Sequence, residues 1–290
     1  FDVIFASHLF LKTLQPKIMV FMETELWPNL IKQCKNNNIK LMLVNARLSE
    51  KSLKQYSRFN NLFSPTIKSF DKILTQSQVN QKNFLALGAQ QNNCLLSGNL
   101  KFDLTFNANN EIKQQELASY IGEKRNIWLI ASTHPGDESI ALSAFKKVLK
   151  VDKTALLIIV PRHPERFGDV IELAKQSNFG VVTRSSKEKV TADIHIWVLD
   201  SLGELFAACS FAHVVTMGGS FSDIGGHNPL EPALFSKAII VGPNMSNFSE
   251  ILAQLLDANA IIQLLDNNNV ILSLSEQVID LFTDKSLADY

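Results

Sequence analysis

A glycine-rich segment in the second half of the chain carries residue types that bind a phosphorylated ligand. Residues 217–232 follow an apolar run and contain two glycine pairs, of which the first is Gly218 and Gly219. Glycines let backbone N–H groups approach an anion closely, and the N-terminus of a following helix adds favourable partial charge. The pattern therefore predicts an anion-binding loop between a strand and a helix.

Five consecutive side chains near the end of this segment make the prediction more specific: His227, Asn228, Pro229, Leu230 and Glu231. Asn228 is a favourable N-cap, and Pro229 suits the first turn of a helix. Glu231 would lie in that turn, where its carboxylate can accept hydrogen bonds from a ribose diol. The alternative is a tight crossover loop in which Glu231 only interacts with the helix dipole. The combination of His227, Asn228 and Glu231 favours the ligand site.

Two further loops follow apolar strands and offer groups that bind phosphate. In the first, Ser132 or Thr133 can cap the next helix and bind phosphate; in the second, Pro161 precedes Arg162 and His163. An arginine at such a place can bind a phosphate through two parallel hydrogen bonds. Each loop by itself could be a helix cap with a surface salt bridge. Three such loops in one domain favour a shared site, because ligands bind at the carboxyl ends of parallel strands.

A fourth loop, which gives a weaker signal, follows the expected strand Ile194–Leu199. It contains Leu202, Gly203 and Glu204. Backbone amides in such a turn can recognise the edge of a nucleotide base.

Charged residues also follow expected strands in the front half of the chain. Glu23 and Glu25 come directly after one strand, Arg47 follows the next, and Lys101 lies near the end of this half. We expect these four side chains to face the nucleotide loops across a cleft. The alternative is that they form ion pairs with one another.

Continuous apolar runs at regular intervals indicate the elements that position these loops. Such runs are typical of parallel strands that are covered by helices on both faces. The expected strands are Ile18–Met22, Ile39–Val44, Lys72–Thr75, Asn126–Ala131, Ala155–Val160, Gly180–Thr183, Ile194–Leu199, His213–Met217 and Ala238–Val241. Amphipathic stretches such as Leu142–Lys150 and Phe167–Gln176 lie between them. The pattern predicts a doubly wound α/β fold that occurs twice.

A polar stretch, Phe106–Gln115, precedes the second series of strands and marks the expected boundary between domains. We predict a partial N-terminal domain over residues 1–110 and a complete C-terminal domain over residues 111–290. The front domain is short for a doubly wound fold of about 150 residues. We therefore expect the natural beginning of the protein to be absent from this chain.

Composition excludes several classes of protein. Hydrophobic residues make up 46% of the 290 residues, which excludes a disordered chain. Three cysteines without a CxxC pair argue against a disulfide framework or a zinc site. Residues 1–105 carry 13 Lys and Arg against 6 Asp and Glu, whereas residues 106–290 carry 15 against 22. This asymmetry favours an anionic partner for the front half, and drift of surface composition is the alternative.

Seven motifs occur in an order that resembles the 3-deoxy-D-manno-octulosonic acid (Kdo) transferases of lipopolysaccharide synthesis. They are METELWPN, NARLS, SGNLKFD, ASTHPGDE, PRHPERF, GGHNPLEP and NFSEI. The resemblance covers nearly the whole chain. It implies a GT-B fold of two Rossmann-like domains and an inverting transfer that needs no metal or other cofactor. The donor would be CMP-Kdo and the acceptor a lipid A precursor, lipid IVA.

The resemblance also implies roles for individual residues and a place of action. Glu23 and Lys101 would support charge at the transition state, with Glu25 and Arg47 as less specific candidates. The residues implied in CMP binding are Pro161, Arg162, Leu202, Gly203, Glu204, Asn228, Pro229, Leu230 and Glu231. The protein would act at the cytoplasmic face of the bacterial inner membrane. The family's general base and membrane anchor would precede this chain, so we expect a soluble fragment that binds CMP and transfers little Kdo.

A basic segment of the front half is a candidate for contact with the membrane. Within Lys51–Lys68, four cations alternate with apolar residues such as Tyr56, Phe59 and Leu62. We expect this segment to dock on an anionic membrane surface, and an ordinary helix packed on its own sheet is the alternative. Nucleic acid is not an expected partner.

Two other functions remain compatible with the sequence. One is a nucleotide-sugar epimerase on the same scaffold, in which METELWPN and SGNLKFD would have no role. The other is a nucleotide-sugar binding fragment without catalysis.

Overall fold

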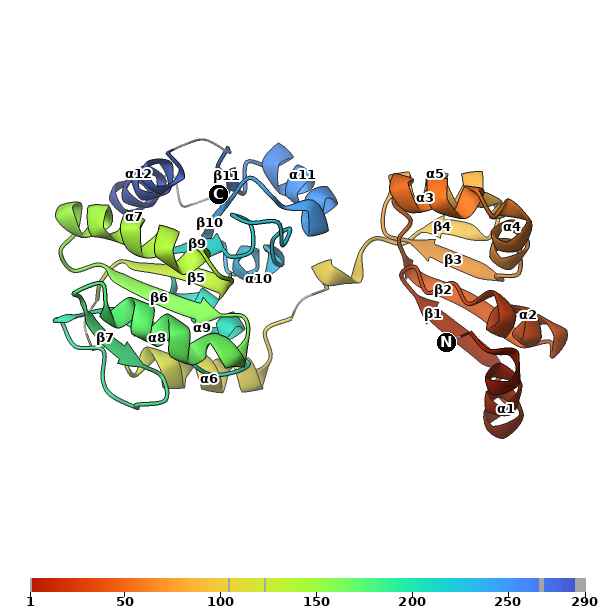
Figure 1. The fold of residues 1–290 in the computed structure, drawn as a ribbon, viewed down its shortest axis with the longest axis horizontal. Helices are drawn as coiled ribbons and strands as arrows, with labels where there is room; N and C mark the ends of the chain where they lie inside the picture. The colour runs from red at the N-terminus through yellow and green to blue at the C-terminus, as the bar shows by residue number, and fades with distance from the viewer. Residues whose placement is uncertain (1, 104, 123, 266–268, 285–290) are drawn as a thin grey trace. The chain divides into compact units, whose positions relative to one another are not determined.

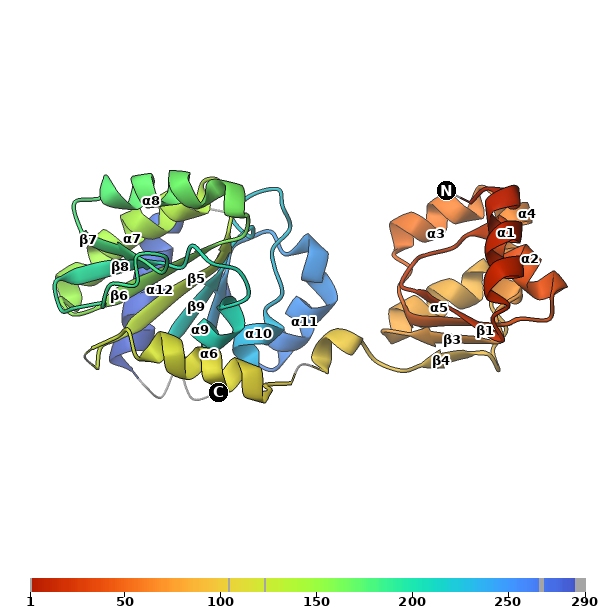
Figure 2. The ribbon, with the colours of Figure 1, turned by 90° about the horizontal axis from the view of Figure 1, so that it is seen from below.

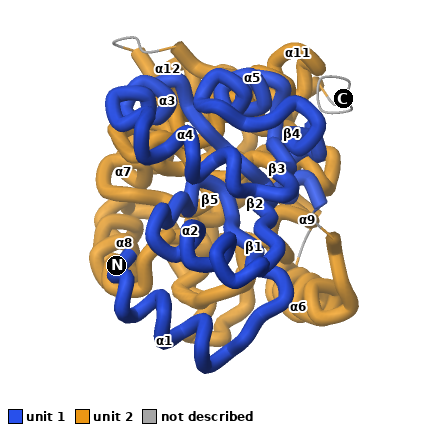
Figure 3. Tube along the Cα trace, turned by 90° about the vertical axis from the view of Figure 1, so that its right-hand side faces the viewer, with its two compact units in different colours: residues 1–103 blue, residues 104–290 orange. Residues whose placement is uncertain are grey.

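The chain forms two compact units, residues 1–103 and 104–290 (Figures 1 and 3). The computed structural model describes residues 2–103, 105–122, 124–265 and 269–284. Each unit is an α/β sandwich with its own parallel sheet.

The first unit contains a four-stranded parallel sheet in the order β1-β2-β3-β4. Its strands are β1 (Ile18–Met22), β2 (Lys40–Ala46), β3 (Lys72–Thr75) and β4 (Cys94–Leu96). Its helices are α1 (Ile4–Leu14), α2 (Pro28–Asn36), α3 (Glu50–Ser57), α4 (Asn60–Lys68), α5 (Gln78–Leu87) and the 3₁₀ turn η1 (Leu100–Phe102). Strands that follow one another in sequence order place their crossover helices on the same face of the sheet, because parallel crossovers are right-handed.

One face of this sheet carries the core of the first unit. Leu41 and Leu43 of β2 pack there with Ile31 of α2, Ile67 of α4 and Phe84 of α5. On β1 the alternate side chains point the other way and are about half exposed, at 54% for Ile18, 53% for Val20 and 50% for Met22.

The second unit contains a seven-stranded parallel sheet in the order β11-β10-β9-β5-β6-β8-β7. Its strands are β5 (Ile127–Thr133), β6 (Leu156–Pro161), β7 (Gly180–Thr183), β8 (Ile194–Val198), β9 (Val214–Met217), β10 (Ala238–Val241) and β11 (Ile262–Gln263). Its helices are α6 (Ala108–Ala118), α7 (Asp137–Val151), α8 (Phe167–Lys175), α9 (Leu205–Phe211), α10 (Leu230–Ala233), α11 (Ser249–Asp257) and α12 (Val270–Thr283), with 3₁₀ turns η2 (Pro164–Arg166) and η3 (Ser246–Phe248).

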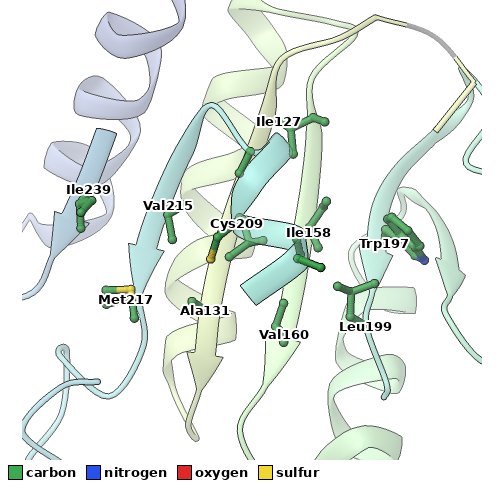
Figure 4. Close-up of a cluster of buried hydrophobic side chains, with 14 of the residues drawn as sticks. Ile127, Ala131, Ile158, Val160, Trp197, Leu199, Cys209, Val215, Met217 and Ile239 are labelled. Carbon is green, nitrogen blue, oxygen red and sulfur yellow. The ribbon is translucent and has the colours of Figure 1, made fainter. Parts of the chain in front are cut away.

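Helices cover both faces of this second sheet (Figures 1 and 2). Alternate residues of β5 enter two separate cores. Leu129 and Ala131 pack in the core that α9 covers, whereas Trp128 and Ile130 pack against α7 and α12. Figure 4 shows Ala131 in the first of these cores with Cys209 of α9. Every residue of β5 is therefore buried, which explains its continuous apolar sequence.

The structure confirms all nine expected strands, with ends shifted by at most two residues. It adds β4 and β11, which have three and two residues and are too short to give a periodic signal. The expected domain boundary at residue 110 lies inside α6. Asn107 caps this helix by accepting a hydrogen bond from the backbone N of Asn110, so the polar stretch is a helix start that packs on α9.

Candidate functional site

The candidate site lies at the carboxyl edge of the second sheet, where the direction of winding reverses. β5 has β6 on one side and β9 on the other. The chain moves from β5 toward β6 first and reaches β9 only later, so the segments after β5 and β9 leave the sheet in different directions. Ligands of doubly wound folds bind in the crevice that such a reversal opens.

Gly218 and Gly219 bring the segment after β9 into contact with the end of β5. A Cβ atom on Gly218 would lie 2.6 Å from the carbonyl oxygen of Ser132, so no other residue fits there. Gly219 has φ +66°, which favours glycine. The structure therefore explains this glycine pair by close packing of two loops.

The second glycine pair folds the loop back on itself. Gly226 N–H donates to the carbonyl oxygen of Gly219 at 2.9 Å, and Gly225 and Gly226 have φ of +93° and +76°. His227 therefore lies next to Gly219, and a Cβ atom there would be 3.2 Å from the His227 ring.

Asp137, in the first turn of α7, ties the loops after β5 and β9 together. Its Oδ2 accepts hydrogen bonds from the backbone N–H of His134 at 2.8 Å and of Gly219 at 2.7 Å. The side chain is buried, and burial raises the pKa of this carboxyl against the lowering effect of its hydrogen bonds. Asp137 thus fixes the distance between two of the candidate loops.

Glu138 holds the loop after β6 in the same way. Its Oε1 accepts from the hydroxyl of Thr133 at 2.6 Å and from Nη1 of Arg166 at 2.8 Å. The same Arg166 nitrogen donates to the carbonyl oxygen of Thr133 at 3.1 Å. This ion pair, between the buried Glu138 and the partly buried Arg166, anchors the loop that presents Arg162.

Three histidines meet at the mouth of the site. Nε2 of His134 lies 2.8 Å from Nε2 of His227, and the two rings are parallel within 7°. The ring of His163 makes an edge contact with His134, with centroids 5.3 Å apart. Burial lowers the pKa of His227 to about 4, with His134 and Arg162 contributing in the same direction.

Glu231 and Arg162 form the charged part of the site. Glu231 lies in the first turn of α10, as expected, and is largely buried. Burial raises the pKa of its carboxyl, while the positive charge of Arg162 acts to lower it. Arg162 is exposed to solvent and so remains available to an incoming anion.

Some sequence predictions in this region are wrong in detail. Neither Ser132 nor Thr133 caps α7, because both belong to β5 and Gly136 is the N-cap. The hydroxyl of Thr133 instead donates to Glu138. α10 begins at Leu230 with Pro229 as its N-cap, and Oδ1 of Asn228 accepts from the N–H of Leu230 at 3.3 Å.

The loop with Leu202, Gly203 and Glu204 has its carboxylate engaged within the protein. Oε1 of Glu204 accepts from Nε of Arg184 at 3.1 Å, and Ser201 also donates to this carboxylate. Leu202 is 69% exposed, and Gly203 has φ +74°. The exposed backbone of this loop is the part left to contact a base, which stays a prediction.

In the first unit, the segments after β1, β2 and β4 lie side by side. Arg47 N–H donates to the carbonyl oxygen of Glu23 at 3.3 Å, and Leu100 N–H donates to Oδ1 of Asn45 at 3.1 Å. Glu23 and Asn45 adopt left-handed backbones, with φ of 52° and 49°. Such conformations are strained in residues other than glycine and cluster at functional sites.

The charged residues of this edge have different surroundings. Oε2 of Glu25 accepts from the indole N–H of Trp27 at 2.6 Å, and both Glu23 and Glu25 are exposed. Lys101 is half-buried in η1. Among the described residues, Glu23, Glu25 and Arg47 take part in no ion pair, which argues against mutual pairing of these three.

Four site residues were missed by sequence reasoning: His134, Asp137, Glu138 and Arg166. All lie in the two motifs ASTHPGDE and PRHPERF, in which the predicted ligand groups were the hydroxyls of Ser132 and Thr133 and the guanidinium of Arg162. The sequence signal that could have revealed them is the pair of acids, Asp137 and Glu138, directly after His-Pro-Gly at the start of an expected helix.

Other potential sites are less informative. Two cavities of about 570 and 500 Å³ lie at the opposite, amino edge of the second sheet, and both are lined by Asn126, Thr154 and Phe282. Within the described ranges, no group of His, Cys, Asp and Glu side chains is arranged to hold a metal ion. No helix in the described part of the chain is long and apolar enough to span a bilayer.

Two Rossmann-like units, with polar loops at the carboxyl edges of their sheets, place the chain in the GT-B fold class. The sequence model described as "3-Deoxy-D-manno-octulosonic-acid transferase (kdotransferase)" matches residues 1–104. Two curated proteins named 3-deoxy-D-manno-octulosonic acid transferase extend the match. That of Haemophilus influenzae is 36% identical over 264 residues, covering 90% of this chain and 61% of the relative. That of Rickettsia bellii is 32% identical over 295 residues, covering 100% of this chain and 68% of the relative.

The chain belongs to the 3-deoxy-D-manno-octulosonic acid transferase family. It spans less than two thirds of the Haemophilus relative's length. Among solved structures, the C-terminal CMP-Kdo binding domain of WaaA from Acinetobacter baumannii is 30% identical, with a TM-score of 0.55, and the match covers 62% of this chain and 90% of that domain. The UDP-GlcNAc 2-epimerase of Neisseria meningitidis has a TM-score of 0.64 and covers 99% of this chain and 73% of its own, but at 13% identity it shows the fold alone.

Proposed function

We propose that this chain takes part in an inverting, metal-independent transfer of Kdo from CMP-Kdo to a lipid A precursor, lipid IVA. The observation that carries the proposal is the convergence of Arg162, His227 and Glu231 at the winding reversal of the second sheet. Family membership supports the reaction class, and the Acinetobacter domain supports the choice of CMP-Kdo as donor.

The donor nucleotide would bind at the second unit. The guanidinium of Arg162 suits its phosphate, because it presents hydrogen-bond donors to an anion. The backbone N–H groups of Gly218 and Gly219 already donate to the carbonyl oxygen of Ala131 and to Asp137, so this glycine pair would shape the loop beside the phosphate. Glu231 suits the ribose hydroxyls, and the backbone of Leu202 and Gly203 suits the base. Ser132, Thr133, Pro161, Asn228, Pro229 and Leu230 would shape the loops around it.

In the proposed reaction, a sugar hydroxyl of the acceptor attacks the anomeric carbon of Kdo while the bond to the phosphate of CMP breaks. The hydroxyl proton passes to a general base, and CMP leaves with the bonding electrons. Arg162 stabilises the charge on the departing phosphate. Glu23 and Lys101 of the first unit support charge at the reacting carbon, with Glu25 and Arg47 as secondary candidates.

Calorimetric titration of residues 1–290 with CMP, UDP and GDP tests the donor assignment. We expect CMP to bind most tightly. Preference for UDP would favour the epimerase alternative, which at present rests on a likeness of fold. An assay of Kdo transfer to lipid IVA separates the transferase from a binding fragment without catalysis.

We also propose that the first unit contacts an anionic membrane through α3 and α4. Lys51, Lys54, Arg58 and Lys68 are exposed there, together with Phe59 at 65% and Leu62 at 51%. Leu53, Tyr56 and Phe63 of the same segment pack on the core of the unit instead. The basic and apolar surface thus consists of six side chains rather than the whole segment.

Vesicle co-sedimentation tests this surface. Each cation near an anionic surface contributes about 1 kcal/mol, so Lys51→Glu with Lys54→Glu should weaken binding to phosphatidylserine vesicles strongly and in a salt-dependent manner. The matched control is Lys146→Glu with Lys147→Glu on α7, which should bind as the parent does. Equal loss in both double variants would reject α3 and α4 as the contact.

A further inference from the structure

The histidine pair of the candidate site is joined by its ring nitrogens. His134 comes from the loop after β5 and His227 from the loop after β9, and their Nε2 atoms are 2.8 Å apart. At this separation a single hydrogen lies between the two nitrogens, because two N–H groups cannot point at each other. One imidazole therefore donates and the other accepts.

This geometry limits the charge that the pair can carry. A neutral pair has one Nε2–H donor and one Nε2 acceptor. A single added proton can enter at a free Nδ1 and leave the Nε2–H···Nε2 bond intact. A second added proton would occupy the accepting Nε2 and break the bond. The pair is thus built to hold either no charge or one positive charge.

The surroundings of the pair favour the neutral state when no anion is bound. Burial lowers the pKa of both histidines, and His163 and Arg162 lower it further. The charged and titratable groups around the pair come from the loop after β6 and from α7; they are Arg162, His163, Arg166, Asp137 and Glu138. Glu231 of α10 interacts with Arg162. Of the acids, Glu138 raises the pKa of His134 but is already paired with Arg166.

We infer that the His134–His227 pair takes up one proton when the donor's phosphate binds, so that a single imidazolium charge meets the anion. The inference rests on the proposed function, because it needs a nucleotide phosphate among these loops. A phosphate near the pair places negative charge beside the imidazoles. This charge raises their pKa and favours the protonated form. The site with bound nucleotide thereby carries one imidazolium charge that the unliganded site does not carry.

Calorimetry in two buffers of different ionisation enthalpy measures how many protons the protein takes up for each CMP bound. At about pH 7.5 the phosphate of CMP is mainly dianionic, because its second pKa is about 6, and it contributes few protons itself. We expect residues 1–290 to take up a substantial fraction of one proton per CMP at this pH and about one near pH 6.5. His227→Gln and His134→Gln keep an amide near the Nε2 position without a titratable ring, so both should bind CMP with much smaller uptake.

His163→Gln tests the neighbouring ring, since His163 shares the site but is not joined through Nε2. His163 lowers the pKa of both paired histidines, so its loss should change the size of the proton uptake without abolishing it. His8→Gln, at an exposed position on α1 outside the site, is the matched control and should take up protons as the parent does. Uptake that is abolished in His163→Gln but kept in the pair variants would overturn the inference. Long-range ¹H–¹⁵N spectra of the parent need no variant and should show the one free Nδ1 of the pair becoming protonated as CMP is added. Binding without proton uptake would overturn the inference alone, whereas absence of CMP binding would overturn the proposed function with it.

Discussion

Glu231 is the residue of the second unit whose role is most directly testable by substitution. Its carboxylate is largely buried in the first turn of α10, and Arg162 partly offsets the cost of that burial. Loss of a hydrogen bond to a charged group costs about 1.5–3 kcal/mol, which corresponds to roughly 10–150-fold in affinity. We expect Glu231→Ala to bind CMP more weakly by this factor.

Glu231→Gln serves as the control, because its amide oxygen still accepts one hydrogen bond. We expect an intermediate affinity for this variant by calorimetry. If a folded Glu231→Ala protein bound CMP as tightly as the parent, the assignment to the ribose would be wrong.

His227 gives a pH dependence of stability whose sign follows from its pKa. Its pKa is about 4 in the folded chain against an ordinary value of 6.5, so between these values the unfolded chain binds more protons than the folded one. Stability is therefore lost as pH falls from 6.5 toward 4. We expect His227→Gln to flatten this part of the curve of melting temperature against pH, whereas His8→Gln, at an exposed position on α1, should leave it unchanged.

The start of α7 governs the distance between two loops of the site. Asp137→Ala removes the acceptor for the backbone N–H groups of both His134 and Gly219. A buried donor without a partner costs about 1–3 kcal/mol, so we expect lower stability in urea and weaker binding of CMP. Asp137→Asn keeps an acceptor oxygen and removes a poorly solvated charge, so it should restore most of both properties.

Asp169→Ala provides the matched control for this element. Asp169 also lies in the first turn of a helix, α8, but is exposed. Its loss should change neither CMP binding nor stability by more than about 0.5 kcal/mol. Parental CMP affinity in a folded Asp137→Ala protein would show that the two loops hold their places without it.

The two units have different proposed roles: the second binds the nucleotide, and the first supplies the acceptor-side residues. Every residue assigned to the nucleotide lies in the second unit, which has a sheet with a core on each face. We expect residues 104–290 to fold alone and bind CMP within about threefold of the whole chain, a difference of roughly 0.7 kcal/mol. Kdo transfer should be absent from this piece, because the acceptor-side residues Glu23 and Lys101 are missing. A much weaker affinity in calorimetry would place part of the nucleotide site in the first unit.

The sequence by itself determined the local features of this protein. Buried parallel strands require continuous apolar runs, so nine strands were readable from the pattern. The loop motifs contained the candidate ligand groups and the signature of the family, because these depend on residue type and short spacing. Strands of two or three residues, such as β11 and β4, carry too few positions to be recognised.

Only the tertiary structure decided which loops meet. His134 and His227 are 93 residues apart in sequence and become neighbours because β9 pairs with β5. Strand order depends on long-range packing across several crossovers, which no local periodicity encodes. For the same reason the sequence did not reveal that Asp137 joins two loops, or that Glu204 is paired with Arg184 from a different strand end.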